Sequence, residues 1–367
     1  MKAIQDSPDC LFYFLLNVGD GDTQLILLPA ETIGGQDTPS RRALVVDVAT
    51  TDKLPALIET LAGQKILRER KDLFAIAIGS HPHDDHIGGM PEFIDRLGGY
   101  ISEYWEPGYY HPTPAYIETM RALEMRPHIV LTQPTSGMTR YIGKVKLTTL
   151  SPGIGLRNRF DSYGTTINDA SIALKVEFPA SRVVQEGVNR AYLRLADPWS
   201  MVLGADAQTT SWAQASVDFP QLHSGPRSAV YEELRKAMGS DWLKAQIFKV
   251  PHHASKHGVN IELVERMGPR LCLVSSTGGA GRYGFPHHLA IEAIREGMEP
   301  TTSGNQRSQD HDIGLHYTSA TDGQGTKLGS FALMIPPKRG SKLRMWRLGD
   351  ASSDRIDLAK SREFSFR

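Results

Sequence analysis

The 367-residue sequence has little cysteine, no excess of charge of either sign and no long apolar run. Its two cysteines, Cys10 and Cys272, are too few for a disulfide framework and form no metal-binding pair, which is typical of a cytoplasmic protein. Lysine plus arginine and aspartate plus glutamate both number 41, so no global attraction to nucleic acid or acidic membranes is indicated. No apolar segment approaches the roughly 20 residues that span a bilayer. The apolar stretch from Leu11 to Leu16 is too short for a signal peptide, and we expect none.

The length allows one large domain or two ordinary ones. Because no linker, repeat or low-complexity tract stands out, we predict a single domain with insertions over residues 1–367, with a core at about 11–336 and a C-terminal extension at about 337–367. Short apolar runs between turn residues predict strands, and helical spacing predicts helices at Met90–Leu97, Tyr231–Met238 and His288–Glu296. Strands first, then a helix, then strands and helices again fit an α/β fold with two sheets packed between helices.

Four potential metal ligands fall within six residues directly after the apolar run 74–79: His81, His83, Asp85 and His86. Imidazole and carboxylate groups are the usual ligands of zinc and related divalent ions. In an extended segment His81 and His83 share one side, and a turn into a helix would rotate Asp85 and His86 toward a neighbouring metal. The spacing therefore suits two metals better than one.

Three further polar clusters lie at the ends of predicted strands. Asp206 follows the run 201–205, His252 and His253 follow 247–251, and Asn168-Asp169 precedes 172–176. Strand ends are rigid, so they hold ligands to the tolerance that metal geometry demands. The two carboxylate oxygens of an aspartate at position 206 could bridge two cations.

The segment His81-Pro82-His83-Asp84-Asp85-His86 matches the HxHxDH motif of the metallo-β-lactamase superfamily, and Gly204-Ala205-Asp206 and His253 follow in that family's order. The chain most closely resembles the hydrolase domain of the ComEC-type competence proteins and their stand-alone relatives, over roughly Phe12 to Ile335. That group's V-G-x-G-D, N-D-x-S, K-V-P-H-H-G-S-K and Y-G-H-P-H stretches are similar to Asn17–Asp22, Asn168–Ser171, Lys249–Lys256 and Tyr283–His287. Ala254 stands where glycine is usual, and Phe285 where histidine is usual. The resemblance implies a four-layer αββα sandwich.

The resemblance also implies a role for each ligand-type residue. His81 and His83 would bind the first divalent ion, Asp85 and His86 the second, Asp206 would bridge them and His253 would complete the second site. Zinc is the expected metal, with manganese or iron as alternatives. The family normally supplies another histidine to the first metal just before Ser171. Asn168 or Asp169 occupies that place here, which leaves open whether one or two ions bind; further candidates for the position are His111 and His128.

The implied activity is that of a metal-dependent hydrolase that uses a metal-bound hydroxide. The expected substrate is a phosphodiester, in a nucleic acid, a nucleotide or another small molecule. Asp85 would also orient the nucleophile, and His252 would donate a proton to the developing oxyanion or leaving group. No substrate-binding residue is predicted. An acyl, lactone or thioester hydrolase of the same fold, and a non-catalytic metal-stabilised binding module, are the alternatives.

Several residues near these motifs have an ordinary structural interpretation as well. Asp47 ends a strand and either supports a ligand or forms a turn, and His252 could serve only as a hydrogen-bond partner of a ligand. Gly19–Asp22 is best interpreted as a hairpin turn. His287 and His288 either cap a helix or reach the site. An aromatic group either packs on the core or lines a substrate cleft: Tyr104, Trp105, Tyr109, Tyr110 and Tyr116.

Overall fold

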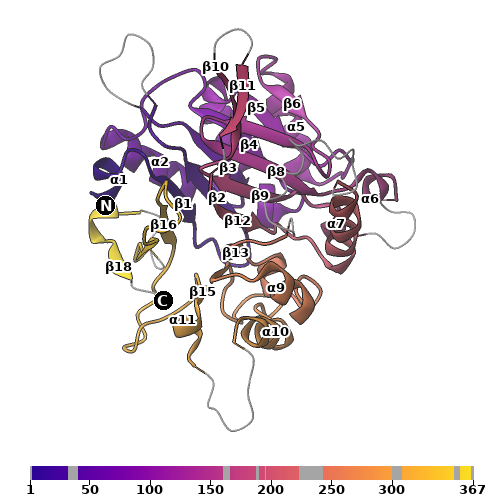
Figure 1. Cartoon of the computed structure of the whole chain (residues 1–367), viewed down its shortest axis with the longest axis vertical. Helices are drawn as coiled ribbons and strands as arrows, with labels where there is room; N and C mark the ends of the chain where they lie inside the picture. The colour runs from indigo at the N-terminus through magenta and orange to yellow at the C-terminus, as the bar shows by residue number, and fades with distance from the viewer. Residues whose placement is uncertain are drawn as a thin grey trace.

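The computed structural model describes residues 2–31, 40–159, 166–186, 190–194, 196–222, 243–299, 308–350 and 356–364. Two large sheets pack face to face, and helices cover both outer faces (Figure 1). Of the predicted helices, 90–97 and 288–296 are present as α4 (Met90–Leu97) and α10 (His288–Met298), whereas 231–238 lies outside the described residues.

Within the described residues, the larger sheet has nine strands. Their spatial order is β18 (Arg362–Phe364), β17 (Arg344–Arg347), β16 (Phe331–Ile335), β1 (Leu11–Leu15), β2 (Thr23–Leu27), β3 (Ala43–Val48), β4 (Phe74–Ile78), β5 (Glu103–Trp105) and β6 (Val130–Thr132). Strands β3, β4, β5 and β6 run parallel to one another, whereas every pairing from β18 through β3 is antiparallel. Beyond residue 336, β17 and β18 therefore extend this sheet at the edge next to β16.

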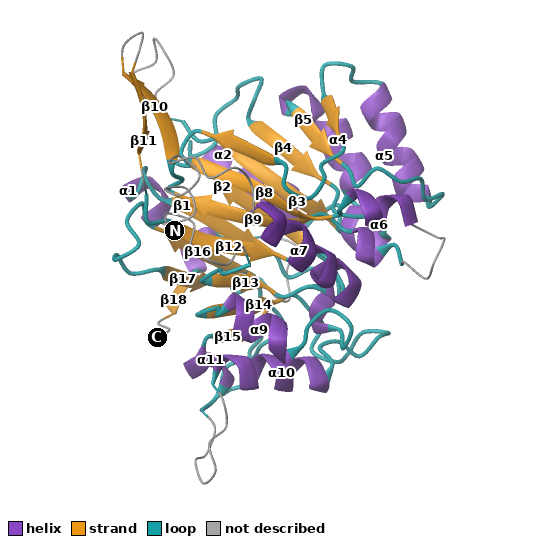
Figure 2. Cartoon of the chain, turned by 45° about the vertical axis from the view of Figure 1, so that its right-hand side comes forward, coloured by secondary structure: helices purple, strands orange, loops and turns teal. Residues whose placement is uncertain are grey.

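The second sheet has seven strands in the described part of the chain. Their order is β15 (Leu315–Tyr317), β14 (Leu271–Val274), β13 (Ile247–Lys249), β12 (Trp199–Leu203), β9 (Ala173–Phe178), β8 (Val145–Ser151) and β7 (Thr139–Ile142). Strands β12 to β15 are parallel, so their carboxyl ends lie at one edge. A separate hairpin, β10 (Arg182–Glu186) and β11 (Arg190–Arg194), projects from the sheets (Figure 2).

Successive side chains of a strand point to opposite faces of its sheet, and this alternation produces the layers. Within β1, Leu11, Tyr13 and Leu15 point between the two sheets, whereas Phe12 and Phe14 point to the outer face, and all five are buried. The outer face of the larger sheet is covered by α1 (Ala3–Asp6), α2 (Lys53–Gly63), α4 and α5 (Pro114–Glu124). The outer face of the smaller sheet is covered by α7 (Thr209–Leu222), α9 (Ile261–Met267) and α10. The structure thus confirms the predicted α/β fold, a four-layer αββα sandwich.

Three short elements complete the description near the strand ends: α3 (Asp84–Ile87) follows β4, and the single-turn helices η2 (Asn168–Ala170) and η3 (His252–Ala254) precede β9 and follow β13. The remaining short helices lie elsewhere: α6 (Ile154–Arg159), α11 (Asp310–Ile313), η1 (Gly98–Tyr100) and η4 (Leu358–Lys360). Among the described residues, no helix has both the length and the apolar character that a membrane crossing requires.

Candidate metal centre

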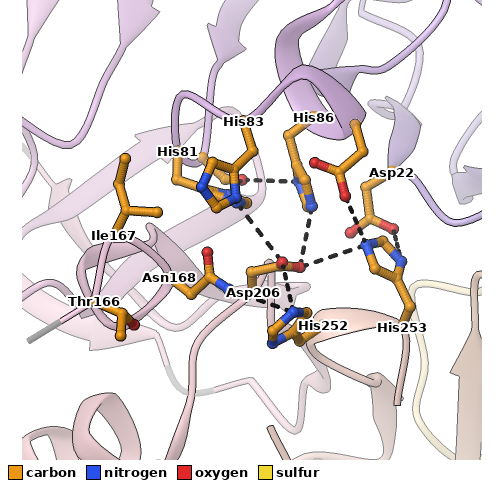
Figure 3. Close-up of polar contacts among 12 residues, drawn as sticks. Asp22, His81, His83, His86, Thr166, Ile167, Asn168, Asp206, His252 and His253 are labelled. Atoms are coloured by element: carbon orange, nitrogen blue, oxygen red, sulfur yellow. Dashed lines mark hydrogen bonds and ion pairs between the residues drawn. The ribbon is translucent and has the colours of Figure 1, made fainter. Parts of the chain in front are cut away.

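The ends of β4, β12 and β13 and the turn η2 bring the ligand-type side chains together (Figure 3). His83 is extended, with φ −84° and ψ 147°, and the chain turns into α3 at the next residue. His81 and His83 consequently lie side by side, with His81 Nε2 3.1 Å from His83 Nδ1, while α3 carries Asp85 and His86. The local geometry expected from the motif spacing is therefore present.

Asp206 lies at the centre of the group, between the histidines that follow β4 and those of η3 (Figure 3). Its Oδ1 is 3.0 Å from His86 Nε2 and 3.7 Å from His253 Nε2. Its Oδ2 is 3.7 Å from His81 Nε2 and 3.6 Å from His252 Nε2. The carboxylate is only 1% exposed, so these imidazoles replace water around it.

His252, His253 and Ala254 adopt three consecutive left-handed conformations, with φ values of 48°, 51° and 62°. Each such non-glycine residue costs about 1–3 kcal/mol, and the surrounding structure must hold it in place. The turn points His253 inward: its Nδ1 donates to the Ser275 carbonyl at 3.1 Å, and its Nε2 is 3.6 Å from Asp85 Oδ2. The strained turn thus holds His253 Nε2 toward Asp85 and Asp206.

Asp47 supports His86 from behind. Its Oδ2 accepts from His86 Nδ1 at 2.7 Å and from the Ser80 hydroxyl at 2.7 Å, and its Oδ1 accepts from the Ser80 backbone N–H at 2.7 Å. Asp47 is fully buried and has φ 58°, so it both forms a turn and orients a ligand-type residue. Because the carboxylate fixes a proton on Nδ1, His86 Nε2 is the nitrogen that faces Asp206.

Of the two residues expected where the resembled family has a histidine, Asn168 lies within the group. Its Nδ2 lies 3.3 Å from His252 Nε2, and its Oδ1 is buried and has no hydrogen-bond partner among the described residues. Asp169 is engaged elsewhere, because its Oδ2 accepts from the backbone and hydroxyl of Thr166. His111 comes no closer than a ring-centroid distance of 6.0 Å to His83, and His128 instead contacts the Gly98 carbonyl at 3.0 Å.

The His252 ring is held between two amides. Gln208 Nε2 lies 3.1 Å from its Nδ1, and Asn168 Nδ2 lies 3.3 Å from its Nε2. A neutral imidazole accepts at one nitrogen only, so both amides cannot donate to it. If Asn168 donates to Nε2, the Gln208 carbonyl accepts from Nδ1–H, and the Asn168 carbonyl oxygen is then free to face the centre.

Burial and neighbouring charges together shift the pKa values of the clustered side chains. Burial, followed by the positive charge of His86, lowers the pKa of His81 well below its usual value. Burial alone would raise the pKa of Asp206, yet the nearby His86, His252 and His253 hold it well below the ordinary range of a carboxyl group. Burial would lower the pKa of His86 and of His253, yet the Asp206 carboxylate holds the pKa of each above its usual value. A carboxylate surrounded by imidazoles is a donor set that divalent cations prefer.

Two residues that the motif analysis left without a role also support the group. The Asp22 carboxylate pairs with the buried Lys249 ammonium, and its Oδ1 is 3.9 Å from His253 Nδ1. Asp22 N donates to the Asp85 carbonyl at 2.9 Å, so the turn 19–22 docks directly on the motif loop. Both residues lie in the stretches that carry the family resemblance, which is the only sequence signal that could have found them.

The residues of the predicted aromatic group differ in their exposure. Tyr104, Trp105 and Tyr109 are buried, whereas Tyr110 is 68% exposed and packs edge-on against Tyr116. The Tyr109 hydroxyl donates to the Ile167 carbonyl at 3.0 Å and so helps to position the neighbouring Asn168. His287 caps α10, since its Nδ1 accepts from the Leu289 N–H at 3.2 Å. The group therefore serves mainly in packing.

The donor atoms fit divalent cations. In three sets of residues the potential ligand atoms lie within 4.8 Å of one another: His81–Asp85–His86, His81–His83–Asp206 and His86–Asp206–His253. Within the described residues, His86 Nε2, His253 Nε2 and Asp206 Oδ1 are buried without a hydrogen-bond partner. Buried polar atoms that remain unsatisfied are costly, and a shared cation would satisfy them together. A fourth set, Asp22–Asp47–His86, already has partners in Lys249 and Ser80.

No protein-family model and no curated protein sequence matches the chain. Several solved structures are similar to it at low identity. One is YhfI from Bacillus subtilis, a metallo-beta-lactamase fold protein: identity is 13%, 72% of this chain and 86% of that chain are covered, and the TM-score is 0.36. A long form RNase Z from yeast is 10% identical, with 73% and 37% covered and a TM-score of 0.36. A diphosphatase from the PhnP family is 12% identical, with 89% and 99% covered and a TM-score of 0.33. Such similarity assigns no activity, and the fold class rests on the layers described above.

Proposed function

We propose that this protein is a metal-dependent hydrolase that cleaves a phosphodiester. The observation that carries the proposal is the position of Asp206, whose two oxygens face histidines from both halves of the HxHxDH motif and from η3. A buried carboxylate so placed is suited to bridge two divalent ions, with zinc, manganese and iron all compatible with the donor set.

His81, His83 and the Asn168 carbonyl oxygen would hold one ion. Asp85, His86 and His253 would hold the other, and Asp206 would contact both. When bound, such ions lower the pKa of a coordinated water from about 15.7 to about 7 and polarise the bond under attack. The fixed proton positions on His86 and His253 keep their Nε2 lone pairs available to the cations.

Two residues face the substrate side. The Asp85 side chain is 40% exposed, the most open of the carboxylates in the centre, so it can accept a hydrogen bond from a nucleophilic water and orient it. The His252 side chain is 16% exposed and is held by Gln208 and Asn168. Burial lowers the pKa of His252, so its proposed role as proton donor to the leaving group requires that a bound anionic substrate favour the protonated ring.

The rim of the centre favours an anionic substrate. The His287 N–H donates to the Ala254 carbonyl at 2.9 Å, which places His287 beside η3, and the His287 and His288 rings stack with centroids 4.5 Å apart. Lys256 and His257 come two and three residues after the end of η3. A local basic rim on a chain with zero net charge supports a phosphodiester over a neutral lactone. We further propose a cytoplasmic, single-domain protein, in keeping with its two buried free cysteines.

The test is turnover of bis(p-nitrophenyl) phosphate after chelation and reloading with zinc or manganese. We expect metal-dependent turnover that D85N and D206N abolish and that D350N, a change in a remote buried carboxylate, leaves in place. Turnover of lactones or thioesters with none of the phosphodiester would select the acyl hydrolase. Less than one equivalent of bound metal and no activity after reloading would select the binding module.

A further inference from the structure

A ladder of aromatic rings leads from the protein surface to the candidate metal centre. The Tyr283 ring is stacked on Phe285, with centroids 5.7 Å apart and planes 26° apart. The Phe285 ring in turn lies 5.4 Å from the His252 ring and 5.8 Å from the His253 ring. Only two ring contacts therefore separate the exposed Tyr283 from the histidines of η3.

Stacking on Phe285 covers only part of the Tyr283 side chain. Its side chain is 64% exposed, and a large aromatic ring left in water gives up the burial that normally stabilises it. The Arg282 guanidinium lies 5.5 Å from the ring centroid, within cation–π range, and is exposed as well. The outer end of the ladder is thus an exposed aromatic ring with a guanidinium over it, and both groups can stack on a planar ring.

The loop that carries the ladder is held in place from below. Asp20 accepts from the backbone and hydroxyl of Thr277 at 2.7 and 2.9 Å, and the Thr277 hydroxyl accepts from the Gly281 N–H at 2.7 Å. At its far end the Gly279 N–H donates to the Phe285 carbonyl at 2.7 Å. A surface whose supporting loop is already ordered loses little conformational entropy when it binds a ligand.

We propose that Tyr283 and Arg282 form a stacking platform that holds a planar aromatic group of the substrate next to the scissile phosphodiester. The proposal rests on the proposed function, because the platform matters only if the reaction takes place at the adjacent centre. Tyr283 supplies the ring on which the planar group lies. Phe285, which lies between Tyr283 and His252, sets the distance between them. Arg282 supplies the charge that complements the anionic backbone of the substrate. The platform selects phosphodiesters that carry a nucleobase or another flat ring over purely alkyl ones.

The binding test uses ethenoadenosine monophosphate, a fluorescent phosphate ester with a flat ring, and ribose phosphate, which lacks the ring. All measurements use the full-length, metal-loaded protein. Because stacking of one base on an aromatic side chain contributes substantially to affinity, we expect Tyr283→Ala to weaken binding of the fluorescent probe at least tenfold. The affinity for ribose phosphate, measured by calorimetry, should change less than twofold, and Tyr283→Phe should restore probe binding.

Tyr192→Ala is the matched control, since Tyr192 is also exposed and also lies beside an arginine, Arg194, but on the remote β10–β11 hairpin. This variant should bind both ligands like the wild type. Equal weakening of both ligands in Tyr283→Ala, unchanged probe binding, or no probe binding by the wild-type protein would each overturn the platform.

Turnover separates this proposal from the proposed function. Tyr283→Ala should raise KM for bis(p-nitrophenyl) phosphate and leave kcat unchanged. If the wild type turns over no phosphodiester with any metal, the proposed function fails while the binding data still decide the platform. If turnover is metal-dependent and Tyr283→Ala alters neither binding nor KM, the platform alone fails.

Discussion

Replacement of Asp47 by asparagine tests whether the buried carboxylate sets the proton position of a ligand. In the wild-type protein Asp47 Oδ1 accepts from Ser80 N–H, and Oδ2 accepts from both His86 Nδ1–H and the Ser80 hydroxyl. If the asparagine keeps its oxygen on Ser80 N–H, its NH2 group faces His86 and donates to Nδ1. The imidazole proton is then forced onto Nε2, the nitrogen that would bind metal. If the amide flips, its NH2 group faces the Ser80 N–H instead, and because both groups are donors this hydrogen bond is lost.

The size of the effect follows from these bonds. Loss of an outer partner of a metal-ligating histidine typically costs 10- to 100-fold in metal affinity, about 1.4–2.8 kcal/mol. The lost charge-assisted hydrogen bond would also lower the free energy of unfolding of the metal-free protein by about 1.5–3 kcal/mol. Competition against a fluorescent zinc chelator measures the first quantity, and urea unfolding of chelator-treated protein measures the second.

Asp350→Asn is the matched control. Asp350 accepts from Ser330 N–H at 2.7 Å and from the Ser330 hydroxyl at 2.6 Å, the same pattern as Asp47 with Ser80, but its third partner is Lys53. D350N should therefore destabilise the fold and leave zinc affinity within twofold. Zinc affinity of D47N within twofold of the wild type, or an equal loss of affinity in D350N, would refute the assigned role of Asp47.

Two further predictions concern the fold. Lys249→Met leaves the Asp22 carboxylate buried without its ion-pair partner, so the free energy of unfolding measured in urea should fall by about 3–5 kcal/mol; a loss below about 1 kcal/mol would contradict the pairing. Burial, assisted by the Arg347 charge, lowers the pKa of His316 to about 3 from the 6.5 of an unfolded chain. The unfolded state therefore binds the extra proton as pH falls from 6.5 toward 3, and His316 costs up to about 1.4 kcal/mol of stability per pH unit across that window. H316Q should show a correspondingly shallower loss of urea stability between pH 6.5 and pH 5, and an unchanged slope would exclude this role.

The sequence predicts local features of the centre well because they depend on neighbouring residues. The turn into a helix after His83, and the strand ends that present Asp206 and His253, follow from short apolar runs and their punctuation. Burial on both faces of β1 also follows from its unbroken apolar composition.

Contacts between distant segments could not be predicted in this way. Asp22 and Lys249 are 227 positions apart and meet only because the two sheets pack against each other. The role of Asp47 depends on a 39-residue separation from His86 and on a left-handed turn that sequence periodicity does not encode. The sequence predicts the strand at 145–150, but not the strands and helix between positions 103 and 142, because β5 and β6 are only three residues long and their Pro- and Tyr-rich connections mask the alternation.

The two halves of the candidate centre differ in how firmly their histidines are held. On one side, Asp47 and the Ser275 carbonyl accept from the Nδ1 atoms of His86 and His253. On the other, His81 Nδ1 contacts the Ser80 hydroxyl at 3.2 Å and no carboxylate or carbonyl among the described residues, and the amide of Asn168 stands where the resemblance predicts a histidine. Better-held imidazoles bind metal more tightly, so the half with His86 and His253 should fill first.

A zinc titration of the apo-protein should consequently show two steps. His253→Ala should remove the tight step, because it deletes the best-supported ligand of that half. Asn168→His should strengthen the weak step, because an imidazole replaces an amide oxygen for a metal that prefers nitrogen. If the Asn168 carbonyl faced away from the centre, Asn168→Ala would leave the weak step unchanged. A single step of two equivalents, or a tight step that survives His253→Ala, would show that the asymmetry in hydrogen bonding does not set the order of loading.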